Sequence, residues 1–264
     1  MSSSKAAAHE KSPYDLINRG VKRPNLLGTS IFVGFRALDP LLQYGILTHQ
    51  VGSSLLGKVG LQQLPMGLGT NTGTVIDKLG LSPYRLILLA MATGSAVKQI
   101  YWLLFTAEEE FPASAAVPVV IYNTLFNSVN SLIFTCALSS ASLSSNETFP
   151  QTPLIVGSVL YATGILTETI AEIQRRNFKR DPKNKGKAYT GGLWSIARHI
   201  NYTGYSFWRG GYSLAAGGWG WGTFVLSFLL ADFNFRAIPV LDEYCSSRVS
   251  DEFPALCTCK SILV

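Results

Sequence analysis

The chain has 264 residues, of which 47% are hydrophobic and only 14% are charged, and its net charge is +6. A soluble domain usually carries about 25% charged residues, so the composition argues against a water-soluble enzyme. Seven of the 22 basic residues lie between Arg175 and Lys187. A basic loop beside apolar segments is typical of membrane topology and argues against a nucleic-acid-binding protein.

The N-terminal half begins with a polar stretch, residues 1–24, which is expected to form an arm outside the membrane. An apolar segment follows at about 27–47 and contains Arg36 and Asp39, which at such a depth should pair or face the protein interior. Residues 51–82 are rich in Gly, Leu and Gln and predict a short or re-entrant helix followed by a loop.

Clearer membrane spans are predicted further along the chain, because apolar runs of about 20 residues are long enough to cross a bilayer. They lie at about 84–106, 116–139 and 153–173, and then at about 191–217 and 218–240. The last two are rich in Gly and aromatic residues and should pack tightly. The sequence thus predicts an all-α polytopic membrane protein with about 6–7 transmembrane helices.

The predicted organisation has three parts: the polar arm 1–24, an N-terminal transmembrane bundle 25–150 that binds substrate, and a C-terminal part 151–264 that binds a cofactor. Basic loops usually face the cytosol, so the loop 174–189 is placed there. Alternation of the spans then places the N-terminus and the C-terminus in the cytosol as well. The endoplasmic reticulum membrane is the expected location.

The segment with most chemical information is Gly191-Gly192-Leu193-Trp194-Ser195-Ile196-Ala197-Arg198-His199-Ile200-Asn201-Tyr202. Its two glycines allow the backbone to approach a ligand closely. Arg198 and Tyr202 are four residues apart and share a helix face, with His199 and Asn201 beside them. Because arginine binds phosphate through paired hydrogen bonds, this segment and the basic loop before it indicate a site for a large polar cofactor.

The segment resembles the Gly-Leu-(aromatic)-x-x-x-Arg-His-Pro-Asn-Tyr signature of the steroid 5-alpha-reductase-like superfamily, with Ile200 in place of the proline. The resemblance extends over about residues 115–253 and includes the segment Phe235-Arg236-Ala237-Ile238-Pro239-Val240-Leu241-Asp242-Glu243-Tyr244. It implies that the C-terminal helices and loops bind NADPH. The implied cofactor residues, with Arg198 and His199 of the signature, are Glu172, Arg176, Lys179, Lys187, Asn201, Tyr202, Arg236 and Tyr244.

A weaker resemblance in the N-terminal half concerns catalysis. Gln62-Gln63-Leu64-Pro65 resembles the Gln-Glu-(apolar)-Pro motif of steroid reductases, with Gln63 where the acid belongs. The tyrosine that follows in that family corresponds at best to Tyr101. The resemblance implies Gln63 and Tyr101 as catalytic residues, with Gln63 limited to hydrogen bonding. Tyr122 and His49 are alternative proton sources.

The leading expectation is an NADPH-dependent membrane oxidoreductase that reduces a C=C bond conjugated to a carbonyl, in a steroid-, terpenoid- or polyketide-like substrate. The cofactor would perform the hydride chemistry while the protein orients and polarises the substrate. The expected partners are this lipophilic small molecule and membrane lipid, with no nucleic acid and no metal site.

Other functions remain open from the sequence alone. Membrane methyltransferases that modify isoprenylcysteine or phospholipid share an Arg-His-Pro-(polar)-Tyr motif and a later acidic pair. Arg198-His199 and Asp242-Glu243 fit that pattern, and the cofactor would then be S-adenosylmethionine. A redox-neutral isomerase or cyclase on the same scaffold is a third hypothesis, and a non-catalytic lipid-binding protein is a fourth.

Overall fold

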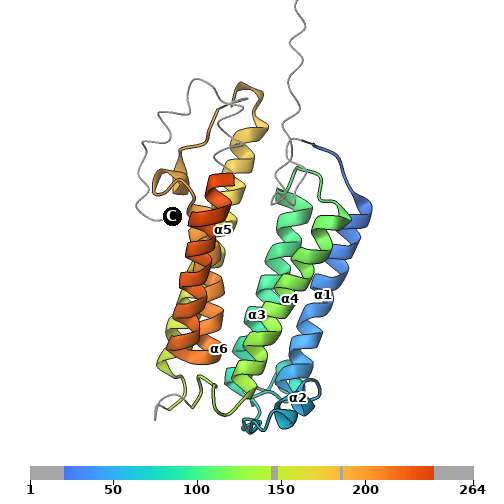
Figure 1. Ribbon diagram of the computed structural model, residues 1–264, viewed down its shortest axis with the longest axis vertical. Helices are drawn as coiled ribbons and strands as arrows, with labels where there is room; N and C mark the ends of the chain where they lie inside the picture. The colour runs from blue at the N-terminus through green and yellow to red at the C-terminus, as the bar shows by residue number, and fades with distance from the viewer. Residues whose placement is uncertain (1–20, 144–147, 185–186, 241–264) are drawn as a thin grey trace, which may run out of the picture.

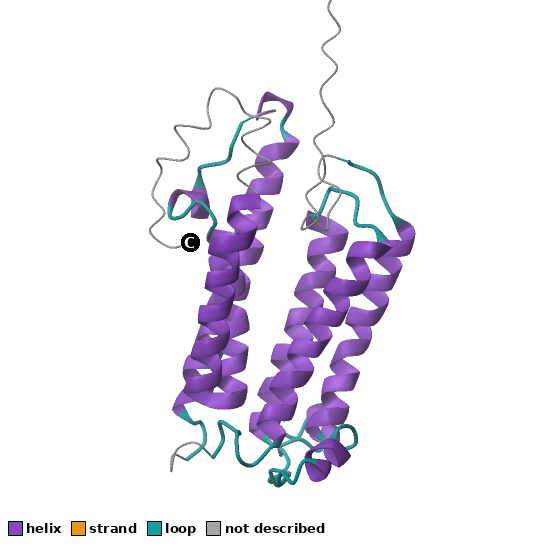
Figure 2. Cartoon of the chain, viewed as in Figure 1, coloured by secondary structure: helices purple, strands orange, loops and turns teal. Residues whose placement is uncertain are grey.

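The structure is a computed structural model that describes residues 21–143, 148–184 and 187–240. Throughout these residues the regular elements are helices joined by loops (Figure 2), so the all-α prediction is confirmed. The helices are α1 (Leu26–Leu47), α2 (Ser53–Lys58), α3 (Pro83–Tyr101), α4 (Ala113–Thr135), α5 (Thr152–Arg180) and α6 (Ile200–Asp232). The shorter 3-10 and π elements are η1 (Val75–Leu79), η2 (Trp102–Thr106), η3 (Pro182–Asn184), η4 (Gly192–Ser195) and η5 (Phe233–Ala237).

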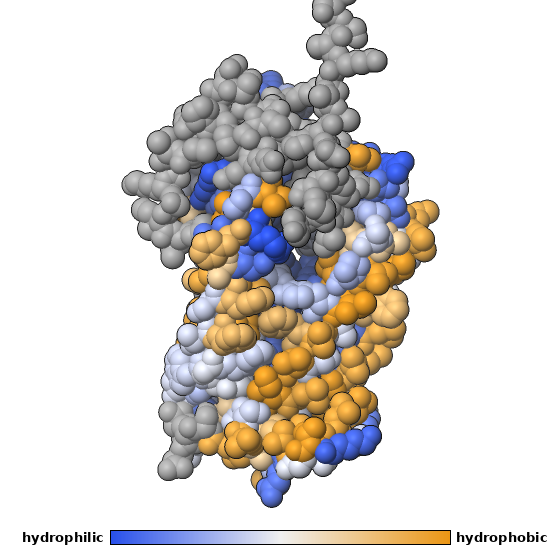
Figure 3. All heavy atoms as spheres, in the orientation of Figure 1, coloured by the Kyte–Doolittle hydropathy of each residue, from blue (hydrophilic) through white to orange (hydrophobic). Residues whose placement is uncertain are grey.

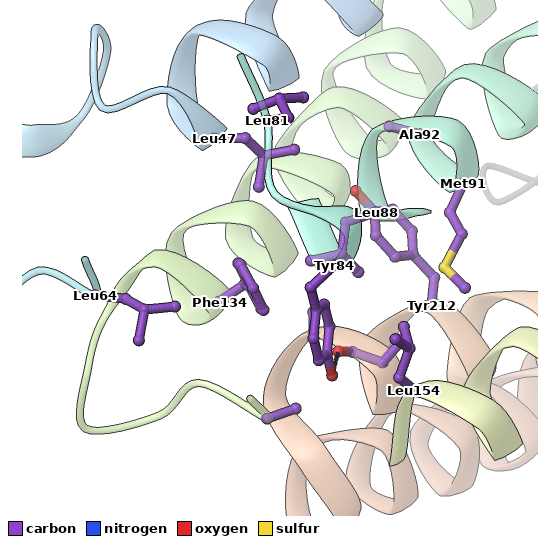
Figure 4. Packing of buried hydrophobic residues seen from close by; sticks show 13 residues of the cluster. Leu47, Leu64, Leu81, Tyr84, Leu88, Met91, Ala92, Phe134, Leu154 and Tyr212 are labelled. Carbon is purple, nitrogen blue, oxygen red and sulfur yellow. Dashed lines mark hydrogen bonds between the residues drawn. The ribbon is translucent and has the colours of Figure 1, made fainter. Parts of the chain in front are cut away.

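The helices form two groups that lie side by side (Figure 1). α1 packs against α3 and α4 in one group, and α5 packs along α6 in the other. A buried core joins the two groups and is shown in Figure 4. There the ring of Tyr84 on α3 lies 4.7 Å from the ring of Phe134 on α4, and the Tyr84 hydroxyl donates to the Ala215 carbonyl of α6 at 2.8 Å.

α6 is a helical hairpin that reverses at Gly218. This residue has φ 74° and ψ −169°, a conformation open essentially to glycine alone. Residues 200–217 form the first arm and residues 219–232 the second. The Tyr202 ring near the start of the first arm stacks on Phe233, just past the end of the second, with centroids 4.5 Å apart. The predicted boundary between the last two spans, at 217/218, therefore falls at the turn.

Glycines let α5 and α6 approach backbone to backbone. A Cβ at Gly164 of α5 would lie 2.4 Å from the Trp208 backbone nitrogen, and one at Gly204 of α6 would lie 2.7 Å from the Glu168 nitrogen. A second pair, Gly157 and Gly211, meets two turns further along, because each glycine is seven residues from its predecessor on the same helix face. Small residues are the usual device for close helix packing in membranes.

Four helices are long and apolar enough to cross a membrane: Pro83–Thr106, Ala113–Thr135, Thr152–Arg180 and Ile200–Val240. Figure 3 shows hydrophobic side chains over much of the face formed by the α1, α3 and α4 group. The count is lower than the expected six to seven for two physical reasons. Ile200–Val240 contains both arms of the hairpin, and α1 carries Arg36, Asp39 and Gln43, which lower its hydropathy.

The first part of the predicted basic loop 174–189 is helical instead. α5 continues to Arg180 because the chain has neither Pro nor Gly between Gly164 and Pro182, and Pro182 then ends the helix. Ion pairs tie this end of α5 to the N-terminal segment and the α3–α4 connection: Lys22 and Arg180 contact Glu108 at 2.6 and 3.3 Å. These segments therefore share one end of the molecule, and their cytosolic placement stays a prediction.

The turn at Gly218 gives the first testable prediction. Gly218→Ala should lower the free energy of unfolding by about 1–3 kcal/mol, because a Cβ is strained in this backbone conformation. The melting temperature of the detergent-solubilised protein measures the loss. Gly220→Ala is the matched control, since a Cβ there meets nothing within 4 Å. Equal melting temperatures for the two variants would show that the turn tolerates a side chain.

Candidate functional site

A buried carboxylate lies at the centre of the candidate site. Glu172 on α5 is 6% exposed. Its Oε1 accepts a hydrogen bond from the Asn201 amide at 2.8 Å, and its Oε2 forms an ion pair with the Arg175 guanidinium at 2.6 Å. Asn201 belongs to the first turn of α6. Because α5 and α6 lie almost in backbone contact at Gly164, the Asn201 side chain reaches Glu172.

The loop before α6 folds onto α5 beside this carboxylate. The Trp194 indole donates to the Ala171 carbonyl at 2.8 Å, and the Leu193 backbone N–H donates to the Gln174 side-chain oxygen at 3.0 Å. Gly192 has φ 56° and a Cβ there would lie 2.5 Å from the same oxygen, so glycine is required. The signature residues Gly-Leu-Trp thus hold the loop in place, and the roles of Trp194 and Gln174 were not anticipated from sequence.

An aromatic stack closes one side of the site. The His199 and Tyr202 rings are 5.5 Å apart and nearly parallel, and Tyr202 stacks on Phe233 with an interplanar angle of 3°. Tyr205 meets Phe233 edge-on at 5.6 Å. Phe233 was missed by sequence reasoning because only the reversal of α6 at Gly218 brings it next to Tyr202.

Several buried polar atoms of this region have no hydrogen-bond partner among the described residues. They are Arg176 Nε, His199 Nε2, Asn201 Oδ1 and Thr203 Oγ1. Buried polar groups nearly always have partners in folded proteins. Four unsatisfied atoms on the last turns of α5 and the start of α6, the segments that meet at Glu172, are therefore consistent with a polar ligand in this region.

His199 carries no charge at neutral pH. Burial lowers the pKa of its imidazole to about 4, and the nearby positive charges of Arg198 and Arg175 act in the same direction. A neutral imidazole keeps one hydrogen-bond donor and one acceptor. His199 is thus a polar, uncharged wall of the site.

The remaining expected cofactor residues are more dispersed. Lys179, near the end of α5, and Lys187, in the following loop, are exposed, and Arg198 is half-buried. Arg236 is exposed and forms a two-pronged ion pair with Asp232, at 2.7 and 2.6 Å. Tyr244 lies outside the described residues. The structure therefore brings together Glu172, Arg176, His199, Asn201 and Tyr202.

The two expected catalytic residues are not brought together. Gln63 lies in the connection between α2 and α3, and Figure 1 shows α2 at the end of the molecule opposite the C-terminal end of α5, the helix that carries Glu172. The Gln63 side-chain oxygen is 2.8 Å from His49 Nδ1. Tyr101 lies in the last turn of α3, 37% exposed, with its ring 5.2 Å from that of Phe105. The length of α3 separates them, because the sequence places one before that helix and the other at its end.

Residues 109–250 match DUF1295, which is described as a family of proteins of unknown function. The chain belongs to this family. The match overlaps most of the stretch, about 115–253, in which the sequence resembles the steroid 5-alpha-reductase-like superfamily. The chain is also 42% identical over 254 residues to the probable O-methyltransferase ustE of Ustilaginoidea virens, a match that covers 95% of this chain and 89% of that protein. No solved structure matches the chain.

The relative corrects the expected reaction. An O-methyltransferase is a transferase, so the expectation of an oxidoreductase acting on a C=C bond is wrong. The physical reason for the error is that the signature segment predicts a binding region and does not encode the reaction performed there. The catalytic roles expected for Gln63 and Tyr101 depend on the reductase reaction and therefore no longer apply.

A second prediction concerns pH. Because the pKa of His199 is about 4 in the folded protein and about 6.5 in an unfolded chain, the unfolded state binds a proton first as the pH falls. The stability of the wild type relative to His199→Gln should therefore decrease between about pH 6.5 and pH 4. Melting temperatures of both proteins across this range test it. A difference that stays constant or grows toward low pH would contradict a buried neutral histidine.

Proposed function

We propose that this protein is an integral-membrane O-methyltransferase that transfers a methyl group from S-adenosylmethionine to an oxygen of a lipophilic small molecule. The named activity of the relative, which matches 95% of the chain, supports the reaction class. The observation that supports this cofactor is the buried Glu172 carboxylate beside the unsatisfied amide oxygen of Asn201. We further propose that this end of the protein faces the cytosol, because the basic residues concentrate there.

The residues present fit this cofactor. S-adenosylmethionine presents ribose hydroxyls and an ammonium group as donors, and Glu172 and Asn201 Oδ1 supply acceptors. Its carboxylate suits the unpartnered Arg176 Nε, since hydrogen bonds between charged groups are strong. Its sulfonium is a cation, which suits the neighbourhood of the aromatic stack of His199, Tyr202 and Phe233, since aromatic rings attract cations.

Each part of the site has a defined task in this reaction. When bound, the cofactor supplies a methyl group on a positively charged sulfur, which an oxygen nucleophile can accept. Glu172 and Asn201 orient the ligand, held by the contact between α5 and α6. The Trp194 loop covers the α5 side, and placing the reactants in a defined geometry is itself a large part of catalysis.

The charges near the site suit S-adenosylmethionine better than a nucleotide with several phosphates. Arg175 is paired with Glu172, and Arg180 is paired with Glu108. Phosphate recognition draws on arginine and lysine groups that can form charge-assisted hydrogen bonds. Two of the arginines in the basic segment already make such bonds with carboxylates of the protein.

Thermal stabilisation gives the third prediction. S-adenosylmethionine and its demethylated product should each raise the melting temperature of the full chain in lipid nanodiscs. At a ligand concentration of 100 times the dissociation constant, the free energy of unfolding should increase by about 2.7 kcal/mol. NADPH at the same concentration should give no shift. Stabilisation by NADPH alone would overturn the proposed cofactor.

Glu172→Gln should weaken S-adenosylmethionine binding by about 10- to 100-fold, because a hydrogen bond to a charged group contributes about 1.5–3 kcal/mol. Calorimetric titration of the nanodisc-embedded protein measures the change. Glu108→Gln is the matched control: it removes an exposed carboxylate at the same end of the molecule, one that pairs with Lys22 and Arg180 and makes no contact with Glu172. Equal losses in both variants would show that the effect is not local.

A further inference from the structure

A second buried polar cluster lies deeper in the molecule, between α1, α4 and α6. Arg36 of α1 and Arg209 of α6 are both fully buried. The Arg36 guanidinium forms an ion pair with Asp39 at 3.1 Å, and the Asn127 amide donates to the same carboxylate at 2.7 Å. Arg209 donates to the Asn127 side-chain oxygen at 3.0 Å, so Asn127 links the two arginines through Asp39.

The cluster carries an excess positive charge. The other contacts of Arg209 are with neutral groups, namely the Asn123 side-chain oxygen, the Tyr205 hydroxyl at 3.3 Å and the Trp208 ring at 4.4 Å. Two arginines therefore share the single carboxylate of Asp39. The nearby Lys98 and Glu168 pair with each other and leave the balance unchanged. Charges within the membrane are expensive and mark functional sites.

Arg36 also has unused hydrogen-bonding capacity. Its Nε and Nη2 have no hydrogen-bond partner among the described residues, although the side chain is fully buried. Arg85, another buried arginine, shows the contrast. It donates to the backbone carbonyls of Leu47, Leu64 and Pro65 and so ties a loop to α3. Arg85 thus uses both of its terminal nitrogens, whereas Arg36 uses only Nη1.

The geometry points to a binding site for a carboxylate group of the lipophilic substrate, held by Arg36 and Arg209. A carboxylate neutralises the excess charge, and its two oxygens match a guanidinium with free nitrogens. This substrate class rests on the proposed methyltransferase function, but the anion site itself does not. An anchored carboxylate selects acidic lipophilic molecules over neutral ones of the same shape.

The cluster is connected to the candidate cofactor site through aromatic residues. Tyr205 accepts the hydrogen bond from Arg209, and its ring meets Phe233 edge-on at 5.6 Å. Phe233 in turn stacks on Tyr202. Tyr205 and Phe233 thus connect Arg209 to Tyr202 by direct contacts, and an apolar substrate body lying along these rings would place its acceptor oxygen at the cofactor end.

The first test compares two probes of equal shape with the full chain in phosphatidylcholine nanodiscs. 2-Naphthoate carries a carboxylate, and 2-naphthalenemethanol is its neutral counterpart. We expect naphthoate to raise the melting temperature and the alcohol to give little or no shift, after subtraction of the effect on empty nanodiscs. Equal shifts with both probes would overturn the proposal, because binding would then depend on the apolar ring alone.

The second test removes one of the two positive charges of the cluster. Arg36→Met should weaken naphthoate binding by about tenfold or more, since it removes a charged hydrogen-bond donor. The ligand-free variant should melt below the wild type, because Arg36→Met leaves the buried Asp39 without its ion-pair partner. The naphthoate preference is therefore the deciding measurement: a merely structural Arg36 predicts the same lower melting temperature with the preference for naphthoate unchanged.

Two further variants keep the test decisive. Arg36→Lys retains the charge without the planar fork and should bind naphthoate more weakly than the wild type, even if Arg36→Met does not fold. Arg180→Gln removes an exposed arginine at the surface and should leave naphthoate binding unchanged. Unchanged binding in Arg36→Lys and loss in Arg180→Gln would place the anion at the surface and overturn the proposal.

S-adenosylmethionine binding is measured in the same samples, which separates the two hypotheses. A shift with S-adenosylmethionine and none with naphthoate would leave the methyltransferase standing and remove the carboxylate site. A shift with naphthoate that Arg36→Met abolishes, without any shift for S-adenosylmethionine, would establish the anion site and remove the proposed function.

Discussion

The close packing of α5 against α6 brings the Asn201 side chain and the Trp194 loop to Glu172 in the candidate cofactor site. Gly164 and Gly204 have no side chains between the two backbones, so the first turn of α6 lies directly against α5. Asn201 is thereby brought to Glu172, and the preceding loop is short enough to fold Trp194 onto Ala171. In lipid, where no hydrophobic effect drives helices together, such contact depends on van der Waals packing and hydrogen bonds.

The reversal of α6 adds the second element of the site. The backbone conformation at Gly218 lets one apolar stretch form two antiparallel helical arms, and this brings Phe233 next to Tyr202. The aromatic stack and the buried carboxylate therefore arise from two separate glycine-dependent features, one between helices and one within a helix. A side chain at either position disturbs a different wall of the same site.

Buried charge is handled in two distinct ways in this protein. The Arg85 guanidinium donates hydrogen bonds to backbone carbonyls and stabilises the end of the molecule near α2. Arg36 instead pairs with Asp39, Arg209 reaches the same carboxylate only through Asn127, and Arg36 keeps nitrogens without partners. Because excess charge buried in a membrane is costly, this arrangement supports the proposed carboxylate site. Arg85 and Arg36 thus show two different uses of a buried arginine within one chain.

Much of this protein follows from its sequence. The all-α membrane architecture comes from the length of the apolar runs, and the segment Gly191–Tyr202 predicts the proposed ligand site because polar groups at the mouth of an apolar helix require partners. The reaction did not follow, since the same signature residues serve a reductase or a methyltransferase equally well. Only the tertiary structure decided that Phe233 meets Tyr202, that Gln63 lies far from Glu172, and that Arg36 and Arg209 share a single carboxylate. The Tyr202–Phe233 contact and the Arg209–Asn127 hydrogen bond join residues far apart in the chain, and spacing along a sequence carries no information about which distant helices will touch.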